Sequence, residues 1–313
     1  MALEPRVAWI IRAFNAFDRG PGDLPMVTRR AQSARLARLR GLVMHPGPSG
    51  VAVADQLVPV QGGKITVRLY RPAKPGTLPL YVFLHGGGWC IGTLDERDPR
   101  CRTIAHEAGC LVASVDYRLA PENTYPTAPE DCYAALQWLV THADELECDP
   151  GRVAIGGESA GANLAAVVCL MARDRSGPAL RYQWLDVPAT DLTLSQPSVH
   201  STPPGYLLDF TQMTAYRDHY LPEPERQALE PYASPLRADD LTGLPPATVL
   251  TCGHDPLRDD GSAYAARLTE AGVAVHHVHL DGHVHPSFAY TRLVPSARSY
   301  EHQAVDWLAA AWG

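Results

Sequence analysis

Hydrophobic positions divide the chain into a helical beginning and a long alternation of strands and helices. Near the start, Val7, Ile10, Ile11, Phe14 and Phe17 recur at the spacing of an amphipathic helix. From about residue 51, short β-branched and aromatic runs alternate with helical segments. The predicted strands are 51–53, 64–70, 80–84, 110–115, 152–155, 182–187, 247–252 and 273–278, and the predicted helices are 131–140, 163–171, 261–271 and 297–312. This order predicts an α/β fold with a mostly parallel, eight-stranded sheet flanked by helices.

Two segments fall outside this alternation. Residues 1–45 have a helical pattern with no strand, and residues from about 195 to 240 are rich in Pro and Tyr and follow a predicted strand. We interpret 1–45 as the N-terminal part of a helical cap. The rest, 46–313, is predicted to be one catalytic domain that carries a second cap segment at about 195–240.

Composition limits the partners and the compartment. The chain has 313 residues, 46% of them hydrophobic, and a net charge of −7, which argues against nucleic acid or an acidic membrane surface as a partner. The apolar runs are too short to span a bilayer, and the first residues lack the features of a signal peptide. Seven cysteines without a C-x-x-C pair indicate reduced thiols. We therefore expect a cytoplasmic protein without stable membrane insertion.

The turn at 156–161 is the first candidate for chemistry. It has the pattern G-x-S-x-G around Ser159, between an apolar strand and an apolar helix. Gly157 and Gly161 suit a sharp turn in which the strand end and the helix start approach closely. The helix start would point free N–H groups toward an anion forming at Ser159. By itself the pattern is a weak signal, since a glycine-rich turn can simply carry a surface serine.

A serine nucleophile needs a base, and the base needs a carboxylate that orients it. Asp255 follows the strand 247–252, and a histidine, His283 or His285, follows the next strand. Asp259 and Asp260 are alternative acids, although their place suits the start of the next helix. Upstream, the glycines after His85 end another strand, and their N–H groups could hold a developing negative charge.

These motifs together resemble the hormone-sensitive-lipase-like esterases (bacterial family IV) of the α/β-hydrolase superfamily. The matching stretches are His85–Trp89, Asp116–Glu122, Gly157–Gly161, Asp255–Asp259 and Gly282–His285. The resemblance implies Ser159 as nucleophile, His285 as base and Asp255 as its orienting acid. It also implies an oxyanion hole formed by the N–H groups of Gly87, Gly88 and Ala160. The expected reaction is hydrolysis of short- to medium-chain carboxylic esters, with a small-molecule ester as substrate and no cofactor.

The chain departs from the family pattern at two places. Glu158 stands where the family usually has Asp, and Pro286 follows His285 where the family usually has Gly. Proline restricts the backbone of the residue before it. His283 therefore stays an alternative base, although the register relative to Gly282 favours His285.

Three further residues are candidates for the substrate pocket: Trp89, Tyr206 and Leu207. Each could equally be part of the packing between the cap and the core. The tract 276–285 contains five histidines, which raises the question of a metal. Because no third ligand and no H-E-x-x-H motif accompany them, we predict no metal site.

Two other functions fit parts of the sequence. A non-catalytic small-molecule receptor could share this fold, but the serine, acid and histidine are all present here. An amidase would use the same residues on a different bond. The last strand, near 273–280, is expected at the edge of the sheet and could pair with a second copy in a homodimer.

Overall fold

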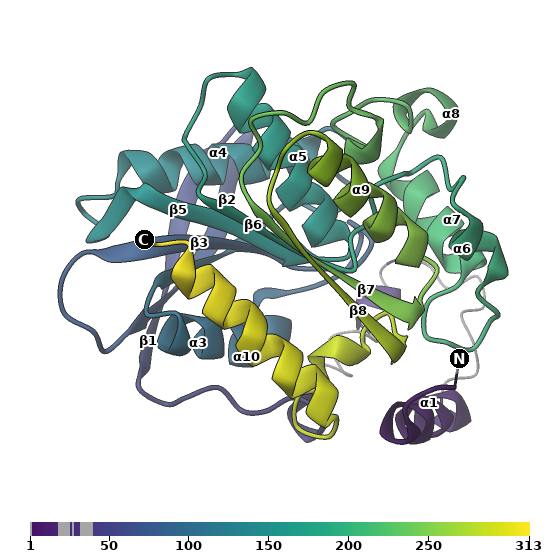
Figure 1. Ribbon diagram of the computed structural model, residues 1–313. Coiled ribbons are helices and arrows are strands. Elements are labelled where there is room, and N and C mark those ends of the chain that lie inside the picture. Colours follow the sequence, from purple (N-terminus) through teal and green to yellow (C-terminus); the bar gives the residue numbers. More distant parts are fainter. Residues whose placement is uncertain (1, 18–25, 27, 32–39) are drawn as a thin grey trace.

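The computed structural model describes residues 2–17, 26, 28–31 and 40–313. Within them, an eight-stranded sheet has the order β1-β2-β4-β3-β5-β6-β7-β8 (Figure 1). The strands are β1 Val51–Val60, β2 Gly63–Pro72, β3 Leu78–Leu84, β4 Leu111–Asp116, β5 Cys148–Glu158, β6 Tyr182–Asp186, β7 Ala247–His254 and β8 Val275–Val284. β2 is antiparallel to β1 and β4, and the neighbours from β4 to β8 are parallel. The predicted mostly parallel sheet is confirmed.

Helices cover both faces of the sheet (Figure 1). One face carries α4 Thr127–Thr141, α5 Ala160–Asp174 and α9 Arg258–Glu270, and the other carries α3 Asp98–Glu107 and α10 Pro295–Ala310. The alternation of β3 serves both cores: Leu80, Val82 and Leu84 pack on the first face, while Tyr81 and Phe83 pack on the second. This two-sided burial explains why β3 is a continuous apolar run.

Each predicted strand overlaps an observed strand, and each predicted helix overlaps an observed helix. The sequence reasoning missed α3, because its many charged residues, among them the buried Arg100, hid a short apolar stripe. Cys101, Ile104 and Ala105 form that stripe, and all three are buried. The spacing of these residues was the available signal.

Described helices of both segments outside the alternation, α1 from the first and α6 and α7 from the second, lie near the carboxyl ends of β7 and β8 (Figure 1). Helix α1, Pro5–Phe17, buries Val7, Ile10 and Ile11 against Val284, Tyr290 and Val294. The later segment contains α6 Pro197–Ser201, α7 Phe210–Tyr220 and α8 Pro224–Gln227; the short 3-10 helices are η1 Arg40–Leu42, η2 Leu94–Arg97, η3 Pro235–Arg237 and η4 Ser287–Ala289. The side chain of Phe17 and residues 18–25, 27 and 32–39, part of the predicted cap, lie outside the described residues.

Strand β8 lies at the edge of the sheet, as predicted, and several of its side chains are exposed. All seven cysteines are buried and unpaired in the described structure. None of the described helices has both the length and the apolar character needed to cross a membrane.

Candidate active site

Ser159 occupies a strained turn between β5 and α5. Its backbone has φ 55° and ψ −120°, which is uncommon for a residue with a side chain. The Ser159 N–H donates to the carbonyl oxygen of Asp186 at 2.8 Å, and the Ser159 carbonyl accepts from the N–H of Asn163 at 2.9 Å. The turn is therefore held at one end by β6 and at the other by the first turn of α5.

The two glycines of the turn allow the close approach that this geometry requires. A Cβ atom on Gly157 or on Gly161 would collide with the main-chain carbonyl of Leu84, at the end of β3. A Cβ on Gly161 would also collide with the carbonyl of His85. The strand–turn–helix geometry predicted for G-x-S-x-G is thus present.

Hydrogen bonds join Ser159, His285 and Asp255. The distance from Ser159 Oγ to His285 Nε2 is 2.8 Å, and the distance from His285 Nδ1 to Asp255 Oδ2 is 2.8 Å. Asp255 is fully buried, and its other oxygen, Oδ1, accepts the N–H of Leu257 at 2.8 Å. Because a carboxylate can only accept, the imidazole proton lies on Nδ1, and Nε2 is free to accept from the serine hydroxyl.

These residues come from three strand ends. Ser159 follows β5, Asp255 follows β7 and His285 follows β8, and the three strands run parallel. Pro286 does not displace the histidine. It is the N-cap residue of the single-turn helix η4, with φ −88°, while His285 keeps both contacts.

His283 faces away from Ser159. Its Nδ1 lies 2.9 Å from Ser287 Oγ, and its Nε2 lies 2.9 Å from Ser296 Oγ and 3.2 Å from Glu4 Oε2. Burial lowers the pKa of the His283 imidazole, and the Glu4 carboxylate opposes this shift. Of the two candidate histidines, the structure brings only His285 to Ser159 and Asp255.

The other candidate acids hold neighbouring loops. Asp260 is buried and accepts the N–H groups of Thr190 and Asp191, both at 2.8 Å. Asp259 accepts the N–H of Ser198 at 2.8 Å. Burial raises the pKa of Asp260 well above its ordinary value. Both carboxylates stand in the first turn of α9, as predicted, and are occupied with main-chain donors.

Gly87, Gly88 and Ala160 line the same cavity as Ser159. The glycines have φ values of 125° and 56°, so this loop turns in a way that side chains disfavour. The N–H groups of Gly87 and Gly88 make no hydrogen bond with any described residue. Ala160 begins α5, where N–H groups also lack partners within the helix. Residues whose N–H groups are available for hydrogen bonding therefore belong to the wall of this cavity.

The cavity beside Ser159 has a volume of about 280 Å³. One part of its wall is apolar and comes mostly from the loop after β6 and from the segment at about 195–240: Leu192, Leu194, Leu207, Leu208, Met213 and Leu257. Another part carries the charged residues Glu96, Arg97 and Glu158. The site therefore combines an apolar pocket with a polar side.

The three candidate pocket residues have different places. Leu207 lines the cavity. Trp89 also lines it, but its ring is buried and stacks on Tyr220, with centroids 4.6 Å apart. Tyr206 is not among the lining residues, because its ring stacks on His254 at 5.5 Å. Sequence reasoning missed Tyr216, whose ring covers Gly88, since nothing marked it within a tyrosine-rich segment.

The histidine-rich tract forms no metal site within the described part of the chain. His277 Nε2 and His279 Nδ1 lie 3.0 and 2.8 Å from the same hydroxyl, Thr251 Oγ1. As expected for alternate residues of a strand, they share one face of β8. Their hydrogen bonds join the edge strand to β7.

A family model described as alpha/beta hydrolase fold matches residues 81–289. The chain belongs to this family, and the resemblance to the hormone-sensitive-lipase-like branch is confirmed. The matched residues run from β3 to η4 and include the candidate triad and the glycine loop.

Two relatives from Mycobacterium tuberculosis have names that state an activity. Carboxylic ester hydrolase LipN is 46% identical over 236 residues, which is 74% of this chain and 63% of LipN. Carboxylesterase NlhH is 44% identical and is covered to 74%, as is this chain. A solved structure, a hyperthermophilic esterase from the archaeon Pyrobaculum calidifontis, has a TM-score of 0.93 at 37% identity, with 99% of each chain covered.

Proposed function

We propose that this carboxylic ester hydrolase cleaves short- to medium-chain esters by acyl transfer to Ser159. The observation that carries the proposal is the chain of two 2.8 Å hydrogen bonds from Ser159 through His285 to Asp255 at the wall of a cavity. His285 is the base, and Asp255 orients it. Relatives that are themselves named as carboxylic ester hydrolases support the same class of reaction.

The reaction follows from the position of each group. His285 Nε2 takes the Ser159 proton as the hydroxyl oxygen attacks the ester carbonyl. The oxyanion accepts hydrogen bonds from the N–H groups of Gly87, Gly88 and Ala160, which need no reorganisation because the loop already holds them. The alcohol leaves with the proton from His285, and a water molecule then hydrolyses the acyl-enzyme by the same route.

The size and lining of the cavity support the substrate class. About 280 Å³ lies at the small end of ligand pockets, and the leucines from 192 to 208 offer an apolar wall for an acyl chain. A short acyl group fits this volume, whereas a long one would have to extend beyond it. Butyryl esters are therefore the first substrates to test.

The assay compares the wild type, Ser159→Ala and the control Ser262→Ala. Ser262 lies on α9, and its hydroxyl donates to a main-chain carbonyl. With p-nitrophenyl butyrate, we expect Ser159→Ala to lower kcat by roughly ten-thousandfold or more, while the control keeps wild-type turnover. A Ser159→Ala variant with a kcat close to that of the wild type would overturn the proposal.

Two further measurements separate the alternatives. A fluorophosphonate should label the wild type at Ser159, because labelling requires an activated serine; an unlabelled wild type would indicate a non-catalytic receptor. Matched ester and anilide substrates with the same acyl group compare esterase with amidase activity, and we expect the ester to react much faster. The cytoplasmic location, the homodimer, the absence of a nucleic-acid partner and the two-part cap stay predictions.

A further inference from the structure

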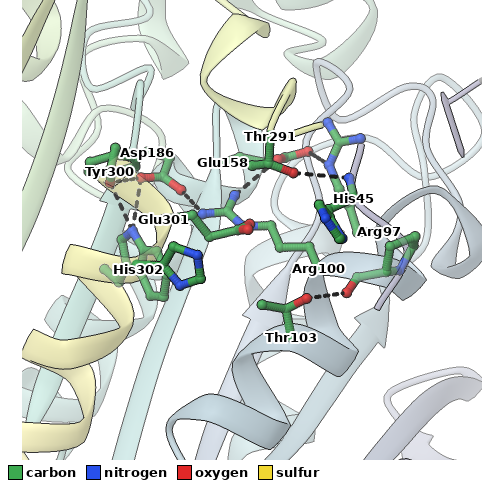
Figure 2. A network of polar contacts seen from close by, with 12 residues as sticks. His45, Arg97, Arg100, Thr103, Glu158, Asp186, Thr291, Tyr300, Glu301 and His302 are labelled. Atoms are coloured by element: carbon green, nitrogen blue, oxygen red, sulfur yellow. Dashed lines mark hydrogen bonds and ion pairs between the residues drawn. The ribbon is translucent and has the colours of Figure 1, made fainter. Parts of the chain in front are cut away.

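A buried arginine lies beneath the turn that carries Ser159. Arg100 comes from α3 and is 2% exposed. Figure 2 shows its guanidinium between the carboxylates of Asp186 and Glu158. Arg100 Nη2 pairs with Asp186 Oδ2, and Arg100 Nη1 lies 3.4 Å from Glu158 Oε2. One side chain thus connects the last residues of β5 and β6.

These two strand ends are the ones that hold Ser159. Glu158 precedes the serine directly, and the main-chain oxygen of Asp186 accepts the Ser159 N–H at 2.8 Å. We infer that Arg100 is a positioning residue, which fixes the nucleophile turn by bridging the carboxylates of Glu158 and Asp186. The inference rests on the proposed role of Ser159.

Other groups fix the Asp186 carboxylate in the same orientation. Trp184 Nε1 donates to Asp186 Oδ1 at 2.8 Å, and the hydroxyl of Tyr300 donates to the same oxygen. The Arg100 guanidinium also lies over the Trp184 ring, 5.0 Å from its centroid, and Glu301 Oε1 is 3.7 Å from Arg100 Nε. Asp186 therefore has little freedom to turn (Figure 2).

Glu158 is fixed from two sides. Its Oε1 pairs with Arg97, which lines the substrate cavity, and its Oε2 faces Arg100. Glu158 is the residue at which the chain departs from the family's usual Asp. The longer side chain reaches both arginines, so the departure has a structural use here.

The energetics favour a geometric role over a stabilising one. Buried ion pairs often add little net stability, because desolvation offsets their attraction, but they define orientation well. Burial raises the pKa of Asp186, and the Arg100 charge opposes this shift. A backbone at φ 55° persists only where its surroundings hold it. Arg100 supplies such a constraint at the residue whose hydroxyl must meet His285.

The test compares Arg100→Met with the double variant Arg100→Met/Asp186→Asn. The single variant leaves a buried carboxylate without its arginine and should lose both stability and activity. The double variant removes the charges of Arg100 and Asp186, retains an oxygen for Trp184 and Tyr300, and leaves Glu158 paired with Arg97. Glu301 still loses its contact with Arg100, 3.7 Å away in the wild type. We therefore expect the thermal midpoint to recover part of the way from the single variant toward the wild type, because Asp186 no longer leaves an unpaired buried charge.

Activity should not recover with stability. We expect the double variant to have a kcat for p-nitrophenyl butyrate about ten- to a hundredfold below the wild type, with KM nearly unchanged, because the serine is misplaced while the cavity remains. The rate of fluorophosphonate labelling should fall in parallel. The pH midpoint of kcat/KM should stay, because Arg100 does not touch His285 or Asp255. A double variant that regains both stability and kcat would show that Arg100 is merely structural.

Two more variants complete the experiment. Arg100→Lys keeps a buried cation but cannot bridge two carboxylates as a guanidinium can, so its kcat should lie between the wild type and Arg100→Met. If the double variant fails to fold, Arg100→Lys tests the inference in its place, and a wild-type kcat in Arg100→Lys would overturn it. Arg102→Met is the control, on the same helix and paired with Asp98 at 2.7 Å, and should keep wild-type kcat.

The outcome for Ser159→Ala separates this inference from the proposed function. If Ser159→Ala is active, the proposed function fails first. If Ser159→Ala is inactive while the double variant and Arg100→Lys have wild-type kcat, only the positioning role of Arg100 fails.

Discussion

His283 and His285 stand two positions apart near the end of β8, yet their side chains contact different parts of the protein. His285 reaches the cavity and bonds Ser159 and Asp255. His283 is enclosed between the start of α1, the start of α10 and η4. Each imidazole lies between a serine hydroxyl and a carboxylate, so the same three chemical groups occur twice at one strand end.

The two serines show what separates the two arrangements. Ser287 is fully buried, and its hydroxyl also bonds the N–H of Val284 at 3.0 Å, so no substrate atom could approach it. Ser159 borders a cavity whose wall also includes Gly87 and Gly88, the proposed oxyanion-hole residues. A hydrogen-bonded serine, histidine and acid therefore do not define a reactive site. Access for a carbonyl and donors for its developing charge are also needed.

The largest expected effect comes from replacing each histidine in turn. We expect His285→Ala to lower kcat for p-nitrophenyl butyrate by roughly ten-thousandfold or more, because Ser159 loses its base. His283→Ala should have a far smaller effect on kcat, since its ring touches neither Ser159 nor Asp255. Circular dichroism checks that both variants are folded. The opposite order of activities would identify His283 as the base.

For stability, the expected order of the two sites is the opposite of the order for activity: replacing Ser287 should matter more than replacing Ser159. Ser287→Ala leaves the His283 Nδ1 and the Val284 N–H without a partner in a buried place. We expect the free energy of unfolding to fall by about 1–3 kcal/mol, whereas Ser159→Ala should change it much less. Urea unfolding of both variants measures the difference. Equal losses of unfolding free energy would mean that the Ser287 hydroxyl does not stabilise the loop after β8 through its contacts with His283 and Val284.

The fold could be predicted from the sequence because its signals are local. Apolar runs in β3 and β5, and the all-round apolar pattern of α5, follow from burial on two sides. Helix α3 was missed because its charged residues, including the buried Arg100, obscured the apolar positions Cys101, Ile104 and Ala105. The two-part cap is still a prediction, since part of it lies outside the described residues.

For the site, the sequence predicts only those residues that motifs and their order along the chain indicate. The motifs indicate Ser159 and Asp255, but two histidines follow Gly282, and the sequence does not show which one meets Asp255. That depends on the path of the chain after β8. Arg100 and Asp186 were not considered at all, because charged residues usually lie at the surface and 86 positions separate these two. Their pairing exists only once α3 packs on β2 and β4 and the Arg100 side chain reaches the ends of β5 and β6.

The smallest expected effect concerns pH and again separates the two histidines. Burial lowers the pKa of His283, so folding favours its neutral form. The stability that this residue contributes is present above the ordinary histidine pKa, about 6.5, and is lost as the pH falls through the lower folded value. His283→Gln keeps a polar side chain but cannot take up a proton. Between pH 7.5 and 5.5, the free energy of unfolding of the wild type should therefore fall more than that of His283→Gln, by at most about 1.4 kcal/mol per pH unit.

Glu4 faces the His283 ring and opposes the lowering of its pKa, so Glu4→Gln in the presence of His283 should make the pH dependence of stability steeper. If urea unfolding shows that the free energy of unfolding changes equally between the two pH values in the wild type and in His283→Gln, this account of the buried histidine is wrong.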